Sequence, residues 1–155
     1  MTFRIKGLSA EPFRHLYGLD AKALAPFGAR RYVVDKSPGF PDRITMRDAE
    51  VGETALLLNH VTHAVDTPYR TAYAIFVREG AEQPFDAVGE VPPAMRARLL
   101  SLRGFDASGM LVDADVVDGR EAESLIARLF ANSQVAYIHA HNARHGCYSG
   151  LIERA

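Results

Sequence analysis

Histidine and cysteine side chains gather near the carboxyl end of the chain, in residues 137–148, which read YIHAHNARHGCY. This stretch of twelve residues holds three of the six histidines and the only cysteine. Imidazole and thiolate groups bind transition metals and act as bases or nucleophiles near neutral pH. This segment is therefore the first place in the chain in which to look for chemistry.

Alternation of side chains predicts a β-strand over residues 135–141. Alanine and isoleucine occupy the even positions, so Tyr137, His139 and His141 share the opposite face of the strand. Two imidazoles at positions i and i+2 would form a polar surface or the floor of a pocket. One of them could act as a general acid or base, because the usual pKa of histidine lies near neutrality.

The same two imidazoles, of His139 and His141, could supply the first two ligands of a divalent metal ion. A third ligand could come from His145 or Cys147 if the turn after Asn142 folds back. The paired ligand spacings that are typical of zinc sites do not occur in the sequence. The competing interpretation is that both histidines are structural or lie on the surface.

Cys147 follows the histidines closely enough to suggest a nucleophilic cysteine, with an imidazole as its base and Asn142 orienting the ring. The geometry of the turn decides whether these groups meet. A four-residue turn after His141 places Cys147 on the face of Ala140, whereas a three- or five-residue turn places it with the histidines. The sequence leaves this open, and the competing interpretation is a buried, unreactive thiol.

A β-hairpin is predicted around residues 106–109, because Asp-Ala-Ser-Gly separates two runs with period-two patterning. Gly109 suits the left-handed position of a three-residue loop. The resulting register places Arg103 opposite Asp113, which favours a structural ion pair over an acid–base couple of Asp113 and Asp115. One face of the hairpin is then apolar, with Leu100, Leu102, Val112, Ala114 and Val116.

Composition indicates one globular domain over residues 1–155. The chain has 48% apolar and 24% charged residues and a formal net charge of -1. Because positive charge is not in excess, nucleic acid and anionic membrane surfaces are not expected as partners. The apolar runs are too short to span a membrane, the N-terminus lacks a signal-like segment, and a single cysteine excludes an intrachain disulfide. A cytoplasmic protein is expected.

Strands are predicted where β-branched and aromatic residues cluster between turns, at residues 30–34, 43–46, 55–61 and 73–78. A short strand and two short helices are expected before them. Helical spacing of apolar residues after a capping box predicts one amphipathic helix over residues 120–131. The expected fold class is α+β, with a twisted, mainly antiparallel sheet of about eight strands and this helix packed on one face.

The other face of that sheet would carry the two histidines and be filled by loops, by curvature or by a partner subunit. The candidate ligand-binding residues of a cleft there are Arg43, Tyr69, Asp113 and Tyr137. His60 and His63, whose spacing is helical, are interpreted as loop residues.

We interpret the chain as a small-molecule-binding protein or an enzyme, between which the sequence does not decide. The alternative is a non-enzymatic interaction module that docks another chain, such as a second copy in a homodimer. The sequence contains no glycine-rich phosphate loop or nucleotide fingerprint, so no nucleotide cofactor is expected.

Four sequence blocks occur in order along the chain: PGFPDRITMRDAEVGE from Pro38, TPYRTAYAIFVREG from Thr67, GMLVDADVVDG from Gly109 and YIHAHNARHGCY from Tyr137. Together they resemble the bacterial family called domain of unknown function 1203. The resemblance spans nearly the whole chain and implies a small, single-domain bacterial protein without an established activity. The family often has a cysteine after Pro-Gly-Phe-Pro, where this chain has Asp42, which weakens the case for a redox or metal role that needs two thiols.

Overall fold

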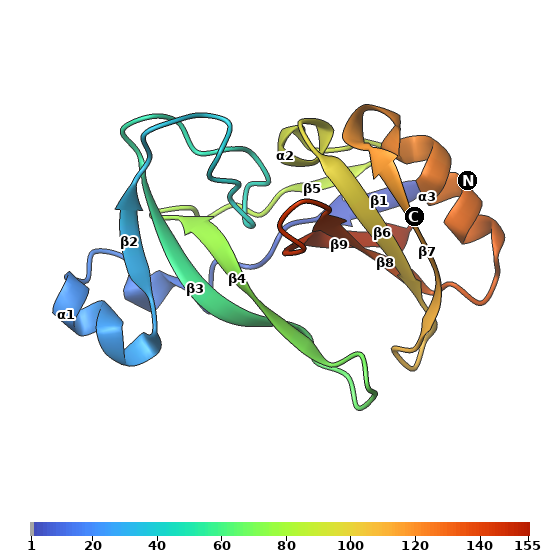
Figure 1. Ribbon diagram of the computed structural model, residues 1–155, viewed down its shortest axis with the longest axis horizontal. Coiled ribbons are helices and arrows are strands. Elements are labelled where there is room, and N and C mark those ends of the chain that lie inside the picture. Colours follow the sequence, from blue (N-terminus) through green and yellow to red (C-terminus); the bar gives the residue numbers. More distant parts are fainter. Residues whose placement is uncertain (1) are drawn as a thin grey trace.

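The computed structural model describes residues 2–155, which fold into two antiparallel sheets linked by loops (Figure 1). The six-stranded sheet has the order β5-β1-β9-β8-β6-β7, and the three-stranded sheet has the order β2-β3-β4. The strands are β1 (Phe3–Lys6), β2 (Arg30–Val33), β3 (Thr54–His63), β4 (Thr71–Arg78), β5 (Asp86–Val88), β6 (Leu99–Phe105), β7 (Leu111–Asp118), β8 (Tyr137–Asn142) and β9 (Tyr148–Arg154). The helices are α1 (Ala21–Leu24), α2 (Pro93–Arg96) and α3 (Ala122–Ala131), with 3-10 turns at Arg14–Leu16, Ala25–Phe27 and Gly119–Glu121.

The α+β class with antiparallel strands is confirmed, and the helix predicted over 120–131 is found as a 3-10 turn followed by α3. The expectation of a single sheet of about eight strands is wrong. Strands β2, β3 and β4 pair only with one another, whereas β1 pairs with β9 from the far end of the chain and with β5. Strand propensities are local, so they do not indicate which strands share a sheet.

Residues 43–46 form a turn rather than the predicted strand. The carboxylate of Asp42 accepts hydrogen bonds from the backbone N–H groups of Ile44 (3.2 Å) and Thr45 (2.8 Å) and from the Thr45 hydroxyl (2.5 Å). Met46 then has a positive φ of 55°. An aspartate that binds the backbone two and three residues ahead stabilises a turn against strand pairing, whatever the apolar pattern.

His60 and His63 lie in β3, so the interpretation of both as loop residues is wrong. The register of β3 with β4 shifts between Val61 and His63. This irregularity interrupts the period-two alternation of the strand, which is why the spacing of the two histidines looks unlike a strand.

Helix α3 packs its apolar stripe on one face of the six-stranded sheet, as predicted (Figure 1). The buried residues of this interface include Leu125, Ile126, Leu129 and Phe130 of the helix and Leu100, Leu102, Ile138 and Ala140 of the sheet. A second buried cluster lies against the three-stranded sheet and includes Phe13, Leu24, Leu56, Ile75 and Val77. Each sheet therefore has its own apolar core.

The β6–β7 hairpin has the predicted register only next to its turn. Gly104 pairs with Asp113, so Val112 is an extra residue that forms a β-bulge. Beyond the bulge the predicted pairing is wrong by one residue, and Arg103 lies opposite Ala114 instead of Asp113.

The bulge reverses the two faces of β7, because one extra residue moves every later side chain to the other side. Asp113 and Asp115 therefore lie on the α3 side, where Arg128 pairs with both at 3.1 Å. Ala114 and Val116, which were expected on the helix-facing side, lie on the histidine-bearing side of the sheet.

Gly119 lies where α2 contacts the turn that precedes α3. Its N–H group donates to the Arg98 carbonyl at 2.8 Å. A Cβ atom at this position would lie 1.9 Å from the carbonyl oxygen of Met95. Two backbones approach closely here, and only glycine allows it.

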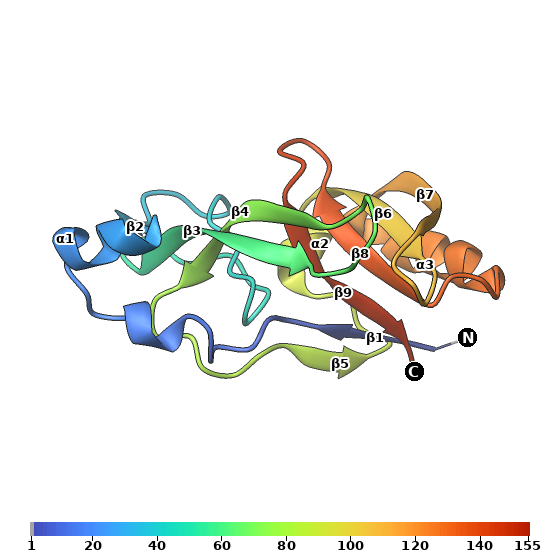
Figure 2. The same cartoon turned by 90° about the horizontal axis from the view of Figure 1, so that it is seen from below.

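The hairpin of β3 and β4 reaches from its own sheet toward the histidine-bearing face of the six-stranded sheet (Figures 1 and 2). Its tip contacts the tip of the β6–β7 hairpin, where the Thr67 hydroxyl donates to the Gly109 carbonyl at 3.1 Å. A second sheet therefore packs on the face that the sequence left open to loops or a partner. The candidate site lies between the two sheets.

Candidate functional site

His139 and His141 lie on the same face of β8, between β6 and β9. Arg103 of β6 is the cross-strand neighbour of His139, and Ser101 is the neighbour of His141. Because β8 is an inner strand with neighbours on both sides, its backbone fixes where the two imidazoles emerge.

A third histidine, His63, comes from β3 of the other sheet. Its Nδ1 lies 2.9 Å from the Tyr69 carbonyl oxygen, which can only accept, so Nδ1 carries the proton. Its Nε2 lies 2.6 Å from the Tyr137 hydroxyl, and in the neutral ring it accepts from that hydroxyl. The His63 and His139 rings are 4.8 Å apart between centroids. The two sheets therefore contact each other through the side chains of His63, His139 and Tyr137.

Aromatic rings surround the three imidazoles. Phe105 and Tyr137 stack with centroids 5.6 Å apart, and Tyr148 lies edge-on to His139 at 5.1 Å. Tyr73 of β4 lies edge-on to His141 at 5.0 Å. Contacts of this kind bury the imidazoles among rings without supplying strong hydrogen-bond partners.

Burial keeps both strand histidines uncharged at neutral pH. His139 is 5% exposed and His141 is 2% exposed. Burial, together with the positive charges that His63, His141 and Arg103 can carry, lowers the pKa of His139 to about 3. Burial also lowers the pKa of His141 to about 4, although its hydrogen bond to the Gly146 carbonyl opposes the shift. Each ring therefore presents a lone pair rather than a charge.

The histidine pocket is a cavity of about 340 Å3 between the sheets. It is lined by His63, Tyr69, Tyr73, Arg103, His139 and His141, with Arg70, Phe105 and Ala114. His141 donates from Nδ1 to the Gly146 carbonyl at 3.0 Å, which leaves Nε2 as its acceptor. Within residues 2–155 no group makes a hydrogen bond to the His139 ring, and neither ring nitrogen is sealed from the cavity.

No carboxylate lines the histidine pocket among the described residues. Arg103 donates only to the Tyr73 hydroxyl and the Ser101 hydroxyl, each at 3.3 Å. Neither Arg103 nor Arg70 forms an ion pair with any residue in the 2–155 range. The pocket therefore has a positive potential without a counter-charge.

The residues predicted as ligand-binding fall in different places. Tyr69 and Tyr137 join the histidines. Asp113 lies on the opposite face of the sheet, paired with Arg128, because of the bulge in β7. Arg43 lies in a second cavity with Cys147, away from His139 and His141.

The turn between β8 and β9 settles the position of Cys147. The Asn142 N–H donates to the Cys147 carbonyl at 2.9 Å, so these two residues face each other across the turn. Tyr148, opposite His141, takes the place on the histidine face. The Cys147 sulfur instead contacts Arg43 Nη2 at 3.1 Å and Asn142 Nδ2 at 3.6 Å. Neither His139 nor His141 contacts this thiol, so the structure does not bring them together with Cys147 as base and nucleophile.

A metal site would need a third ligand beside His139 and His141. In the part of the chain that the structure describes, no three His, Cys, Asp or Glu side chains are placed to hold one ion. The histidine pair can therefore offer a metal two ligands.

The helices of the structure are short. Across residues 2–155, no helix combines the length and the apolar composition that are needed to cross a bilayer.

Three residues that line the site were not predicted as site residues from the sequence: His63, Tyr73 and Arg103. Their contacts with β8 join segments far apart in the chain, and two of the three cross between sheets. Period-two patterning assigns a face within a strand and says nothing about which sheet faces it. The irregularity before His63 also interrupts the period-two alternation that would have assigned His63 to a face of β3.

Comparison with known proteins gives a family and no closer relative. No curated protein and no solved structure matches the chain. The family described as Protein of unknown function (DUF1203) matches residues 39–154, which include all of β3–β9 but neither β1 nor β2. Because the match covers most of the chain and both parts of the histidine pocket, this protein belongs to the DUF1203 family.

Proposed function

We propose that this protein binds a small organic anion in the histidine pocket. The observation that carries the proposal is the His139 ring, which is buried, has no hydrogen-bond partner among the described residues and opens into the cavity. Because the ring nitrogens open into the cavity, they are accessible to a ligand there. A ligand that donates a hydrogen bond to the unprotonated nitrogen would supply the partner that the protein does not.

The charge of the pocket favours an anion. Arg70 and Arg103 line it without ion-pair partners in the described chain, and the histidines carry no negative charge in any protonation state. Arg103 offers a planar guanidinium that suits the two oxygens of a carboxylate. The Tyr73 and Tyr69 rings would cover the apolar part of the ligand.

The size of the pocket favours a small ligand. Its volume of about 340 Å3 lies at the lower end of the range for metabolite sites. A ligand with a carboxylate at one end and a hydroxyl at the other could contact both Arg103 and the His139 lone pair.

The low pKa values of His139 and His141 favour binding over acid catalysis. At neutral pH neither imidazole has a proton to donate as a cation, although each can accept a hydrogen bond. An anion next to these rings would raise their pKa values. Binding would then be accompanied by proton uptake and would tighten as the pH falls.

Thermal-shift measurements with succinate, malate and citrate test the proposal. We expect at least one of these anions to raise the Tm, and to raise it more at mildly acidic than at mildly alkaline pH. Replacing His139 with Phe, or Arg103 with Gln, should remove the shift.

The matched control is Arg128→Gln, an arginine on the opposite face of the same sheet that should leave the shift intact. A Tm that none of a broad panel of carboxylates moves, or a shift that survives both pocket variants, would contradict the proposal.

The alternative, an interaction module or homodimer, stays a prediction. The sheet face on which it depended is packed against the β3–β4 hairpin. Light scattering tests it, since a monomer at high concentration speaks against self-association.

We also propose a cytoplasmic location. A chain with one cysteine does not depend on an oxidising compartment for its stability. Cell fractionation checks this, and recovery from an extracellular or periplasmic fraction would contradict it.

A further inference from the structure

The Arg43 side chain is a buried cation without a carboxylate partner. It is 3% exposed. Its Nε donates to the Tyr148 carbonyl at 2.8 Å, Nη1 to the Pro41 carbonyl at 2.6 Å and Nη2 to the Cys147 sulfur at 3.1 Å. The adjacent Asp42 is engaged by backbone N–H groups and by Thr45. Within residues 2–155 no carboxylate lies at ion-pair distance from Arg43.

A buried guanidinium needs a nearby negative charge to offset the loss of hydration. Burial lowers the pKa of Arg43, and the contact with Cys147 opposes this shift. The other two groups that Arg43 contacts are neutral carbonyls. Cys147 is therefore the one contacting group in the described chain that can become an anion, and a distance of 3.1 Å suits a hydrogen bond to a thiolate.

Cys147 opens into a cavity of about 550 Å3, the thiol pocket. Its charged and titratable lining residues are Lys36, Arg43, Tyr73, Arg98, His145 and Cys147, and no carboxylate lines it among the described residues. Arg98 is held from behind by Asp48 at 2.6 Å. The charged group in contact with the sulfur is Arg43, and its positive charge favours the thiolate.

Asn142 supplies a second, independent sign of a ligand site. Asn142 lines the thiol pocket and is 4% exposed, yet its Oδ1 has no hydrogen-bond partner among residues 2–155. Its Nδ2 lies 3.6 Å from the Cys147 sulfur. A buried amide oxygen without a partner is unfavourable in the free protein, and a small rotation of the amide would let a bound molecule satisfy it.

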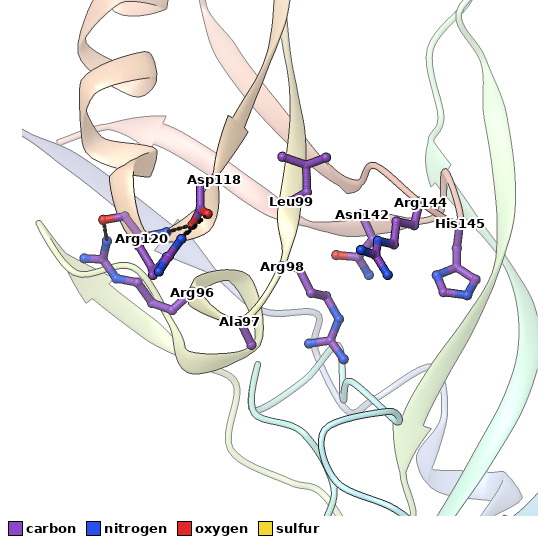
Figure 3. Close-up of a pocket in the computed structure, with 9 residues that line it drawn as sticks. All are labelled: Arg96, Ala97, Arg98, Leu99, Asp118, Arg120, Asn142, Arg144 and His145. Carbon is purple, nitrogen blue, oxygen red and sulfur yellow. Dashed lines mark hydrogen bonds and ion pairs between the residues drawn. The ribbon is translucent and has the colours of Figure 1, made fainter.

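A further hollow, the arginine cleft, shares lining residues with the thiol pocket. Figure 3 shows the residues that line this cleft. It has a volume of about 580 Å3 and is lined by Arg96, Arg98, Arg120, Arg144, His145 and Asn142, with Asp118. Arg98, Asn142 and His145 line both hollows. Arg96, Arg98 and Arg120 each have a carboxylate partner, whereas Arg144 makes no ion pair with any residue the structure describes. Arg144 therefore supplies the unpaired positive charge of the cleft.

We propose that Cys147 is a nucleophilic thiolate held by Arg43, and that its substrate is a small carboxylate with an electrophilic carbon, attracted by the arginine cleft. In the reaction the sulfur electron pair forms an S–C bond while the bond from carbon to the leaving group breaks. The leaving group departs with that bonding pair. No base is needed, because the thiolate has already lost its proton.

Alkylation by iodoacetate and iodoacetamide tests both parts of the proposal, since the two probes differ mainly in charge. Each forms the same kind of S–C bond and releases iodide. With one cysteine in the chain, intact mass reports on Cys147 alone. We expect iodoacetate to react several-fold faster than iodoacetamide with the native protein, and most of this preference to disappear at about 1 M salt, where the Debye length is about 3 Å.

The pH dependence of the iodoacetamide reaction tests the thiolate. An ordinary thiol loses roughly 80-fold in rate between about pH 8 and about pH 6, because its thiolate fraction falls. The protein unfolded in urea should show this loss, whereas the native protein should lose less than about threefold. A native protein that follows the unfolded profile overturns the proposal, and this comparison needs no variant.

Variants test which residues cause the flat pH profile and which cause the preference for iodoacetate. Arg43→Met should restore the steep pH profile, whereas Arg43→Lys, which keeps the charge, should retain part of the reactivity at low pH. Arg144→Ala should reduce the iodoacetate-to-iodoacetamide rate ratio, and Arg30→Ala, an exposed arginine of the three-stranded sheet, should leave it unchanged. Equal ratios in the wild-type protein and the Arg144→Ala variant, or a wild-type preference for iodoacetamide, overturn the anionic substrate.

Discussion

His139 and His141 are almost completely buried, and burial disfavours the protonated, charged form of their imidazole rings. Their pKa values, about 3 and about 4, lie below the value of about 6.5 for histidine in an unfolded chain. Between these limits the unfolded state binds protons that the folded state does not. Stability therefore rises with pH up to about 6.5 and falls as the pH drops toward the folded pKa values.

We predict a loss of unfolding free energy on the order of 2 kcal/mol per histidine between pH 7 and pH 5. Urea denaturation at the two pH values measures it. His139→Phe keeps a ring among the surrounding aromatic side chains and removes one titrating group, so the loss should shrink by on the order of 2 kcal/mol.

The carboxylates with the lowest pKa values titrate below the range from pH 7 to pH 5, so they contribute little to the stability change measured there. The pKa values of Glu53 and Glu79 are lowered to about 2 by their arginine partners, so they act at lower pH. His60, whose pKa is also lowered by burial, adds to the loss in all variants. His15→Ala, at an exposed position, should keep the wild-type pH dependence. A wild-type protein that is equally stable at pH 7 and pH 5 would reject the assignment.

At this scale the sequence predicted part of the site. Alternation placed His139 and His141 on one face, because strand periodicity fixes faces within one element. The pairing of Cys147 with Arg43 could not be predicted, since the partners are distant in the chain and Arg43 lies in a turn set by Asp42.

At the scale of elements, close backbone contacts are more restrictive than close side-chain contacts. Gly119 and Gly104 illustrate the difference. A Cβ on Gly119 would meet a carbonyl oxygen at 1.9 Å, whereas a Cβ on Gly104 would meet the Val135 methyl groups at 3.0 and 3.1 Å. Side-chain methyl groups can shift, but the carbonyl belongs to α2 and moves only with the helix.

We therefore predict that Gly119→Ala destabilises the fold by about 3 kcal/mol or more, and Gly104→Ala by about 1–2 kcal/mol. Chemical denaturation of both variants beside the wild type gives the values. Equal costs at the two sites would show that α2 yields as easily as a valine side chain.

Elements were predicted best where local signals agree. Asp118 caps the 3-10 turn that leads into α3, and α3 has an apolar stripe. Strands β2, β3 and β4 were found close to their predicted ranges. The errors arose where a single residue changes the geometry, at Asp42 and at Val112. A β-bulge adds one residue without changing the composition of a strand, so periodicity does not reveal it.

At the scale of the whole molecule, the two sheets have separate apolar clusters but share polar connections. Phe85 and Ile44 bond through their backbones at 2.7 Å, and Arg43 joins its turn to β9. The Tyr137 hydroxyl bonds His63 across the sheets at 2.6 Å. Because these contacts are buried or partly buried, opening one sheet would leave polar groups of the other without partners.

Calorimetry should therefore show one unfolding transition, with a calorimetric enthalpy equal to the van't Hoff enthalpy. Arg43→Met removes one connection and should lower the ratio of van't Hoff to calorimetric enthalpy. Two resolved transitions in the wild-type protein would mean that each sheet is an independent folding unit.

The β7 bulge also affects what the outer border of the six-stranded sheet can do. A long border strand with free N–H and C=O groups is a template on which other chains can add strands and aggregate. In β7 the irregular step at Val112 interrupts that row, and the carboxylates of Asp113 and Asp115 flank it. We therefore expect the bulge and these carboxylates to disfavour the addition of further strands at this border.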